Sequence, residues 1–170
     1  MVEQVFCTSE WPTYTLRKLL DPVNAAKEAK KYLFIWDKQG SVSTFMQYKG
    51  TLGNIAPSII QIAFGRKTYP EVGDEVRKGF IYAMRTGDNL CVDIDQTKPD
   101  FTEMSSEGTF LADKFFDWEW LEQEENYMKF VREEENHGIG KINPGFGYVR
   151  NKEFSMTIRS GASDETELAQ

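Results

Sequence analysis

The fold of this chain is decided by residues 31–46, which read KYLFIWDKQGSVSTFM. A continuously apolar run, Tyr32–Trp36, ends at Asp37, and Gly40 then introduces a stretch with helical spacing. Apolar runs without alternation are typical of strands that are buried on both faces of a parallel sheet. The stretch therefore predicts a buried strand, a glycine turn and a helix start, which is where α/β nucleotide folds hold phosphate groups.

The turn at Gly40 lacks the residues of a working phosphate loop. Such a loop reads G-x-x-x-x-G-K-[ST], with a lysine directly after its last glycine. Here Lys38 precedes Gly40, and the residue that follows is Ser41, which offers a hydroxyl but no ammonium group. Because no cation is placed to neutralise a triphosphate, we expect a turn that has the shape of a nucleotide site but does not hydrolyse nucleotides.

Glycine stops and hydrophobic spacing predict the next elements. One helix is expected from Asn54 to Gly65 and another over Asp74–Thr86. Leu90–Asp95 follows as a second apolar strand. A strand, helices and a strand in this order form a crossover unit, so the two strands are expected to be a parallel pair.

The chain is long enough for one domain of the α/β class with a parallel sheet. Residues 1–22 are expected to be an irregular N-terminal arm, and residues 23–160 a single degenerate P-loop-like domain. Within that domain, Tyr148-Val149 and Phe154–Arg159 predict two late strands, with a hairpin as one way of joining them. The polar and acidic residues 161–170 are expected to form a disordered tail.

Residues 110–136 are at once acidic and aromatic. The chain carries a net charge of -7, and the stretch from Glu103 to Glu135 holds eleven acidic residues against three basic ones. Aromatic residues at roughly helical spacing predict a long amphipathic helix over 110–136. Such a block repels phosphate backbones, which excludes nucleic acid as a partner. It would suit a basic protein surface, and a merely solvated helix face is the other interpretation.

Four large aromatic residues of this stretch cannot all face one core if they lie on one helix. Phe115, Phe116, Trp118 and Trp120 include pairs two residues apart, which lie on different sides of a helix. Large aromatic residues are common at the centres of interfaces, so Trp118 and Trp120 are candidates for a protein interface. The alternative is that they pack within the core of this chain.

A nucleotide-binding interpretation would use three residues. Asp95 ends an apolar strand, as a Mg²⁺-organising acid does in phosphate-loop enzymes, and Gly40 and Ser41 would form the phosphate side. Asp93, two positions earlier, is expected to point to the opposite face. The alternative function is thus a small Mg²⁺-dependent nucleotide-binding phosphotransferase or NTPase.

Other kinds of site are disfavoured by composition. Cys7 and Cys91 lie far apart and are expected to be reduced thiols in a cytosolic compartment. The chain has a single histidine, His137, and no spacing typical of a zinc site or a catalytic triad. We therefore expect no catalytic residues, no metal and no cofactor. No apolar run reaches the length of a membrane helix, and the N-terminus does not read as a signal peptide.

Residues 34–46 resemble the start of the fifth AAA-type module in the motor ring of dynein heavy chains. There an apolar strand ending in Asp is followed by Pro, Gln-Gly, a short polar helix start and Trp. Asp37, Gln39 and Gly40 match this pattern, Phe45 stands at the aromatic position, and Lys38 replaces the proline. Weaker similarities occur at residues 87–93 and 142–146. The chain also resembles the degenerate module of ciliary proteins that carry IQ motifs and ankyrin repeats.

The resemblance implies a partial, degenerate AAA-type module. In dynein this module lacks the phosphate-binding lysine and serves as a structural segment of the ring. It implies a non-enzymatic structural or adaptor subunit of a ciliary or flagellar axonemal complex, located in the cytoplasm and the axoneme. Partners would be other axonemal or microtubule-associated proteins, and neither nucleic acid nor a membrane. Without further modules, a linker or a stalk, we expect no motor activity from this chain alone.

Overall fold

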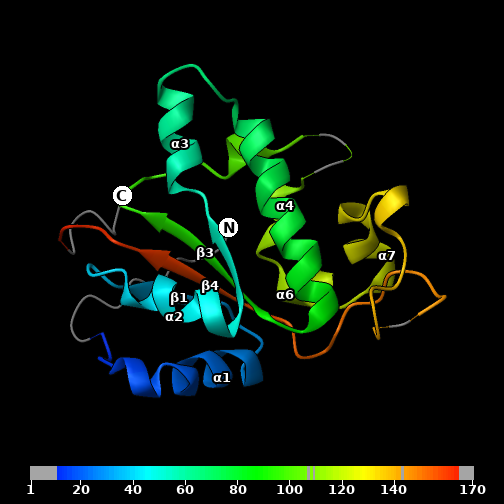
Figure 1. Ribbon diagram of the computed structural model, residues 1–170, viewed down its shortest axis with the longest axis horizontal. Coiled ribbons are helices and arrows are strands. Elements are labelled where there is room, and N and C mark those ends of the chain that lie inside the picture. The colour runs from blue at the N-terminus through cyan, green and yellow to red at the C-terminus, as the bar shows by residue number, and fades with distance from the viewer. Residues whose placement is uncertain (1–10, 107, 109, 143, 165–170) are drawn as a thin grey trace.

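The computed structural model describes residues 11–106, 108, 110–142 and 144–164 (Figure 1). Their strands form one four-stranded sheet in which every pairing is parallel. The predicted α/β class with a parallel sheet is therefore confirmed. The strand order is β1-β4-β3-β2, and the strands are β1 (Leu33–Trp36), β2 (Thr51–Asn54), β3 (Asn89–Asp95) and β4 (Ser155–Ser160).

Helices cover both faces of this sheet. None of those in the described residues is both long and apolar enough to cross a bilayer. The α-helices are α1 (Leu20–Glu28), α2 (Ser41–Lys49), α3 (Ala56–Ala63), α4 (Tyr69–Thr86), α5 (Ala112–Phe115), α6 (Trp118–Leu121) and α7 (Glu124–Tyr127). The 3₁₀ helices are η1 (Leu16–Lys18), η2 (Thr102–Met104), η3 (Met128–Phe130) and η4 (Glu133–Glu135).

The last strand of the chain lies inside the sheet, between the first and the third. Thr157 on β4 is level with Leu33 on β1 and with Cys91 on β3. The two strands that were expected to pair, β1 and β3, are parallel members of one sheet but not neighbours. The hairpin interpretation is wrong, because β4 runs parallel to both neighbours and Tyr148-Val149 forms no strand.

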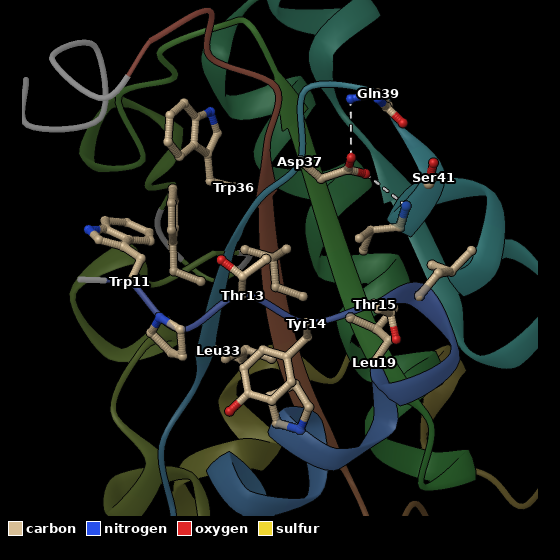
Figure 2. A pocket seen from close by; sticks show the side chains of 16 residues that line it. Trp11, Thr13, Tyr14, Thr15, Leu19, Leu33, Trp36, Asp37, Gln39 and Ser41 are labelled. Atoms are coloured by element: carbon tan, nitrogen blue, oxygen red, sulfur yellow. Dashed lines mark hydrogen bonds between the residues drawn. The ribbon is translucent and has the colours of Figure 1, made fainter.

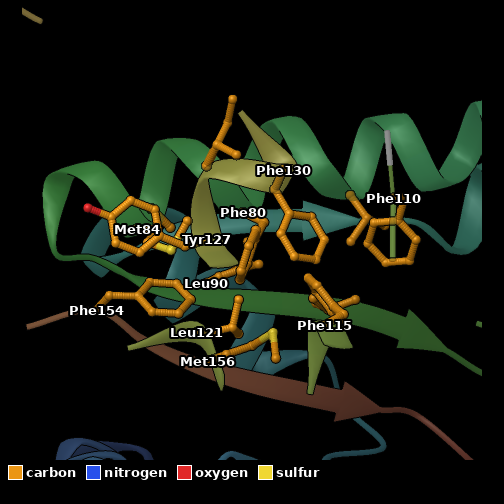
Figure 3. Packing of buried hydrophobic residues seen from close by; sticks show 14 of the residues in the cluster. Phe80, Met84, Leu90, Phe110, Phe115, Leu121, Tyr127, Phe130, Phe154 and Met156 are labelled. Carbon is orange, nitrogen blue, oxygen red and sulfur yellow. The ribbon is translucent and has the colours of Figure 1, made fainter. Parts of the chain in front are cut away.

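Alternation along β3 divides the core into two parts. Cys91 points to the face covered by α1 and α2, where it packs with Val23, Val42 and Met46. Its neighbours Leu90 and Val92 pack in the other cluster, with residues of α4, and α4 covers the other face of the sheet (Figure 1). There Phe80 lies at the centre of a ring cluster (Figure 3), with centroids of Phe115, Phe130 and Phe154 at 4.9, 5.1 and 5.4 Å respectively.

Helix α4 begins five residues earlier than its spacing predicted. The backbone N–H of Thr68 donates to the Glu71 carboxylate at 2.7 Å, which caps the first turn. Gly87 ends the helix with a φ of +84°, a left-handed conformation that favours glycine. The predicted stop was therefore right, and the capping residues upstream of Asp74 account for the extra turn.

The predicted long helix over 110–136 is wrong. The segment folds instead into the short helices α5, α6, α7, η3 and η4. One break falls at Asp117, whose carboxylate accepts a hydrogen bond from the Trp120 backbone at 3.0 Å and starts a new helix. Each break changes the direction in which side chains point, so that Phe115, Leu121 and Phe130 all reach the core.

The two predicted ends of the domain are more ordered than expected. Helix α1 runs through residue 22, where the arm was expected to stop, and Leu19 is buried. At the other end, Ala162 is buried and its carbonyl accepts a hydrogen bond from Trp36 Nε1 at 2.8 Å. Residues 161 and 162 are therefore part of the fold, a correction to the predicted tail. Cys7 and residues 165–170 lie outside the described residues.

Candidate functional site

Three strand ends meet at the carboxyl edge of the sheet around one guanidinium, that of Arg159. The residue lies on β4 and is only 3 % exposed. Its Nη1 donates to Asp93 Oδ1 at 3.0 Å and to Asp95 Oδ1 at 2.8 Å, both at the end of β3. Its Nη2 donates to the backbone carbonyl of Asp37, directly after β1. The crevice beyond the strand ends, where α/β folds bind ligands, is thus crossed by an internal ion cluster.

The Asp37 carboxylate fills the N-terminus of α2. Its two oxygens accept hydrogen bonds from the backbone N–H groups of Gln39 at 3.1 Å and Val42 at 2.8 Å. The Val42 N–H belongs to the first turn of α2 and carries the partial positive charge of a helix N-terminus, which in nucleotide folds is used to hold phosphate. The Arg159 Nε lies 3.8 Å from the same carboxylate. The chain therefore supplies its own anion at this position.

Carboxylates outnumber cations in this cluster. Asp93, Asp95 and Asp37 surround the single guanidinium, and the Ser43 hydroxyl donates to Asp93 Oδ2 at 2.5 Å. Burial lowers the pKa of Arg159, but the hydrogen bond and charge of Asp93, followed by Asp95, outweigh burial and raise it. The arginine stays charged, and it faces three carboxylates.

Two glycines allow the chain to pass close to the guanidinium. Gly40 has a φ of +72°, in the left-handed region, and ends the turn at α2. A Cβ at Gly161 would collide with the Asp95 carboxylate and approach Arg159 Nη2 to 2.9 Å. Residues 160–162 therefore lie directly over the cluster only because position 161 has no side chain.

The structure brings two of the three predicted nucleotide residues to the same guanidinium. Asp95 bonds to it directly, and a Cβ built on Gly40 would lie 3.7 Å from Nη2. Ser41 begins α2 and borders the cavity described below. The expectation that Asp93 and Asp95 point to opposite faces is wrong. Residues two apart on a strand share a face, and both bond to Arg159.

Arg159 was missed by sequence reasoning. The signal that could have found it is the single charged residue of the predicted strand Phe154–Arg159. A charged side chain at a buried strand position requires a partner of opposite charge. The acidic residues of the predicted strand Leu90–Asp95 are Asp93 and Asp95. The pairing of Arg159 with these two acids could be predicted only if β4 were known to lie beside β3.

A cavity of about 600 Å³ lies beside the cluster, between β1 and residues 11–16 (Figure 2). Its lining is mainly apolar and aromatic at one end, where Trp11 and Trp36 have ring centroids 6.5 Å apart. At the other end lie Asp37, Gln39 and Ser41. The cavity thus lies along β1, the outer strand of the sheet, and one of its ends is next to the filled phosphate position.

The predicted interface tryptophans occupy different environments. Trp118 is 7 % exposed and packs against Tyr32, with ring centroids 5.3 Å apart. Trp120 is half-buried, and Lys129 Nζ lies 5.1 Å from its ring centroid. The core interpretation therefore describes Trp118, and only Trp120 keeps surface for a partner.

Two further kinds of chemistry have little support. In the part of the chain that the structure describes, no group of three or more His, Cys, Asp and Glu residues is arranged to hold a metal ion. The Cys91 thiol is buried, and burial, with the nearby Asp93 charge, raises its pKa to about 12. A thiol with that pKa is a poor nucleophile at neutral pH.

Comparison with known proteins gave no relative. No protein-family model, no curated protein and no solved structure matches this chain.

Proposed function

We propose that this chain is a non-enzymatic α/β domain that serves as a structural or adaptor subunit. The observation that carries the proposal is the occupation of the phosphate position by the chain itself. The Asp37 carboxylate accepts the backbone N–H of Val42 at the start of α2, and the Arg159 guanidinium is held by Asp93 and Asp95. A backbone donor at the helix start and the cation, two parts of a phosphate site, are thus used within the fold.

Electrostatics oppose a nucleotide at this edge. Three carboxylates face one guanidinium, so an approaching triphosphate meets an excess of negative charge. Two unit charges about 5 Å apart repel each other by about 3 kcal/mol at an effective dielectric constant near 20. Ser41 adds a hydroxyl at this turn but no positive charge.

The ciliary or axonemal setting rests on the resemblance of residues 34–46 to the degenerate AAA-type module of dynein. The strand, turn and helix expected from that resemblance are present as β1, the turn at Gly40 and α2. Under this proposal the P-loop-like domain is a scaffold in the cytoplasm and the axoneme. Its partners are other axonemal or microtubule-associated proteins.

Calorimetry with ATP and Mg²⁺ on the full chain tests the scaffold role. We expect no binding tighter than a Kd of about 1 mM, and no release of inorganic phosphate. A tight Mg²⁺-dependent heat of binding that disappears in Asp95→Ala would instead support the alternative, a small phosphotransferase.

The axonemal setting needs its own experiment. A tagged chain expressed in ciliated cells should remain with the axonemes after the membrane has been removed with detergent. Trp120→Ala is a suitable variant for locating the contact, because Trp120 is half-buried and keeps exposed surface. Complete release of the wild-type chain into the detergent-soluble fraction would contradict the axonemal part of the proposal.

A further inference from the structure

Strand β1 is an edge of the sheet, and half of its backbone groups face away from the sheet. The Asp37 N–H donates to the Ser160 carbonyl on β4 at 2.8 Å, which fixes the register of this pair. In a parallel pair the residues that bond to the neighbour alternate. Odd-numbered residues of β1 therefore face β4, and the N–H and C=O groups of Phe34 and Trp36 face outward. In the described part of the chain, no strand pairs with this side.

The open edge runs beside the apolar cavity. Phe34, 38 % exposed, and Trp36 line it on the strand side, and Trp11 and Tyr14 line it on the side of residues 11–16 (Figure 2). An unpaired strand with large exposed apolar side chains is a template for the addition of another strand. The cavity offers the pockets that alternate side chains of an added strand require.

Positive charge surrounds this edge. Lys31 precedes β1 and Lys38 follows it, with Lys38 Nζ 4.8 Å from the Trp36 ring centroid. Arg17 and Lys18, on η1, follow the other wall of the cavity. All four are exposed, and among the described residues none of them forms an ion pair with a carboxylate.

Three acids close to these cations in the sequence do not cancel this charge. Asp37 is engaged by the start of α2 and by Arg159, and Asp21 and Glu28 are exposed on α1. The edge of β1 therefore keeps an excess of positive charge, in contrast to the acidic segment 110–136 and to the carboxyl edge.

We propose that β1 is a docking site for an extended acidic segment of a partner protein, which adds to the sheet as a further strand. The backbone of the segment would pair with Phe34 and Trp36, its apolar side chains would enter the cavity, and its carboxylates would face the four cations. This inference deepens the proposed adaptor role and rests on it, since it names the kind of partner that such an adaptor receives.

Two fluorescein-labelled peptides of alternating sequence test the charge preference. One repeats Glu-Val and the other repeats Lys-Val, and anisotropy is measured with the full chain at low salt. The Glu-Val peptide should bind at least about tenfold more tightly, and its affinity should fall as salt is raised to about 0.15 M. The double reversal Arg17→Glu and Lys18→Glu should remove most of this preference. Equal binding of both peptides, or binding of neither, would overturn the proposal.

A proline at position 34 tests the backbone contact. The N–H of Phe34 faces outward, so Phe34→Pro removes an edge donor but leaves the pairing with β4 intact. Phe34→Ala is the matched control, because it removes the ring and keeps the donor. We expect Phe34→Pro to abolish binding of the Glu-Val peptide and Phe34→Ala to weaken it by a few fold. If Phe34→Pro does not fold, N-methylation of alternate residues in the peptide removes the opposing donors and should abolish binding equally.

Other results would assign the edge differently. Concentration-dependent dimers in sedimentation, lost in Phe34→Pro, would make a second copy of this chain the occupant and overturn the proposal. Failure of both peptides to bind would leave the ATP experiment unaffected, so this inference can fail while the scaffold role stands.

Discussion

Two of the buried arginines, Arg159 and Arg77, form ion clusters whose surroundings differ. Arg159 at the carboxyl edge bonds to Asp93, whose side chain is 6 % exposed, and to Asp95, whose side chain is 51 % exposed. Arg77 on α4 is fully buried, but its carboxylate partners Asp74 and Glu135 are 20 % and 21 % exposed. The Arg159 cluster therefore contains one carboxylate closed from solvent, that of Asp93, whereas both carboxylate partners of Arg77 reach solvent.

The two clusters also connect different parts of the chain. Arg159 joins the ends of three parallel strands, so it fixes the edge at which an α/β fold would bind a ligand. Arg77 joins α4 to the end of the acidic segment, through Glu135 and through the Phe130 carbonyl at 2.9 Å. The Glu135 carboxylate is therefore engaged within the fold, and only the other acidic side chains of residues 110–136 are available to a partner.

The largest effect is expected for Arg159→Met. The substitution leaves Asp93 buried without its partner, and removing one member of a buried pair costs about 3–5 kcal/mol of folding free energy. Urea denaturation measures the loss. Arg159→Lys keeps the charge and should lose less. A loss below about 1 kcal/mol for Arg159→Met would show that the cluster is solvated and does not hold the edge.

Trp118→Ala should be nearly as costly. Truncation of a buried tryptophan costs about 3–5 kcal/mol, because it removes apolar contacts and leaves a cavity. Trp120→Ala is the matched substitution at a half-buried position and should cost about 1–2 kcal/mol. Thermal and urea unfolding of the two variants compare them directly. Equal losses would contradict the assignment of Trp118 to the core and Trp120 to the surface.

Arg77→Met should destabilise the protein less than Arg159→Met. Its carboxylate partners can turn to water, so we expect a loss of about 2–3 kcal/mol, below the range for a fully closed pair. The loosening should be local, with faster amide hydrogen exchange over residues 128–136 and unchanged exchange in β3 and β4. Uniformly faster exchange throughout the sheet would mean that the two clusters are not independent.

The smallest effect concerns pH. Burial opposes ionisation of Glu135, but hydrogen bonds from Arg77 and from the Arg132 backbone outweigh it and lower the pKa below the ordinary value of 4.5. A lowered pKa in the folded state stabilises the protein above the unfolded value, and this contribution is lost as pH falls through the folded value. Stability should therefore decline below about pH 4.5.

Glu135→Gln provides the control for this pH dependence. The variant should show a shallower decline in acid, because one of the carboxylates with a lowered pKa is removed. The pKa of Asp74 is also lowered, because hydrogen bonds from Lys78 and Arg77 outweigh the effect of burial. Asp74 therefore accounts for part of the decline in stability that remains in the variant. Identical slopes for wild type and variant below pH 4.5 would exclude a role for Glu135 in acid unfolding.

Local patterns were enough to predict one half of the fold. Strand β1, the turn at Gly40, α2 and β3 follow from apolar runs and glycine stops, and each depends on neighbouring residues only. Strand β2 was missed because four residues, Thr51–Asn54, include a glycine and show no apolar run. The position of β4 between β1 and β3 could not be predicted, because pairing between distant strands leaves no mark in local spacing.

The acidic segment shows why periodicity misled. Its aromatic residues recur at roughly helical intervals, which indicates one long helix. The structure instead divides the segment at Asp117 and Gln123, where new helices begin. Phe115, Leu121 and Tyr127 are all buried, although they would point to three different sides of a single helix. The position of the candidate site could be predicted from the turn at Gly40. The role of its central cation, Arg159, could not, because it depends on tertiary contacts.

The most direct test of the filled phosphate position is nitrogen-15 NMR of the Arg159 side chain in the full chain. Its guanidinium N–H groups should exchange slowly with water, unlike those of the exposed Arg17, and their frequencies should not move when Mg²⁺ and ATP are added. Fast exchange, or a shift of the Arg159 signals that saturates with ATP, would show that the position is open to a nucleotide and would contradict the scaffold account.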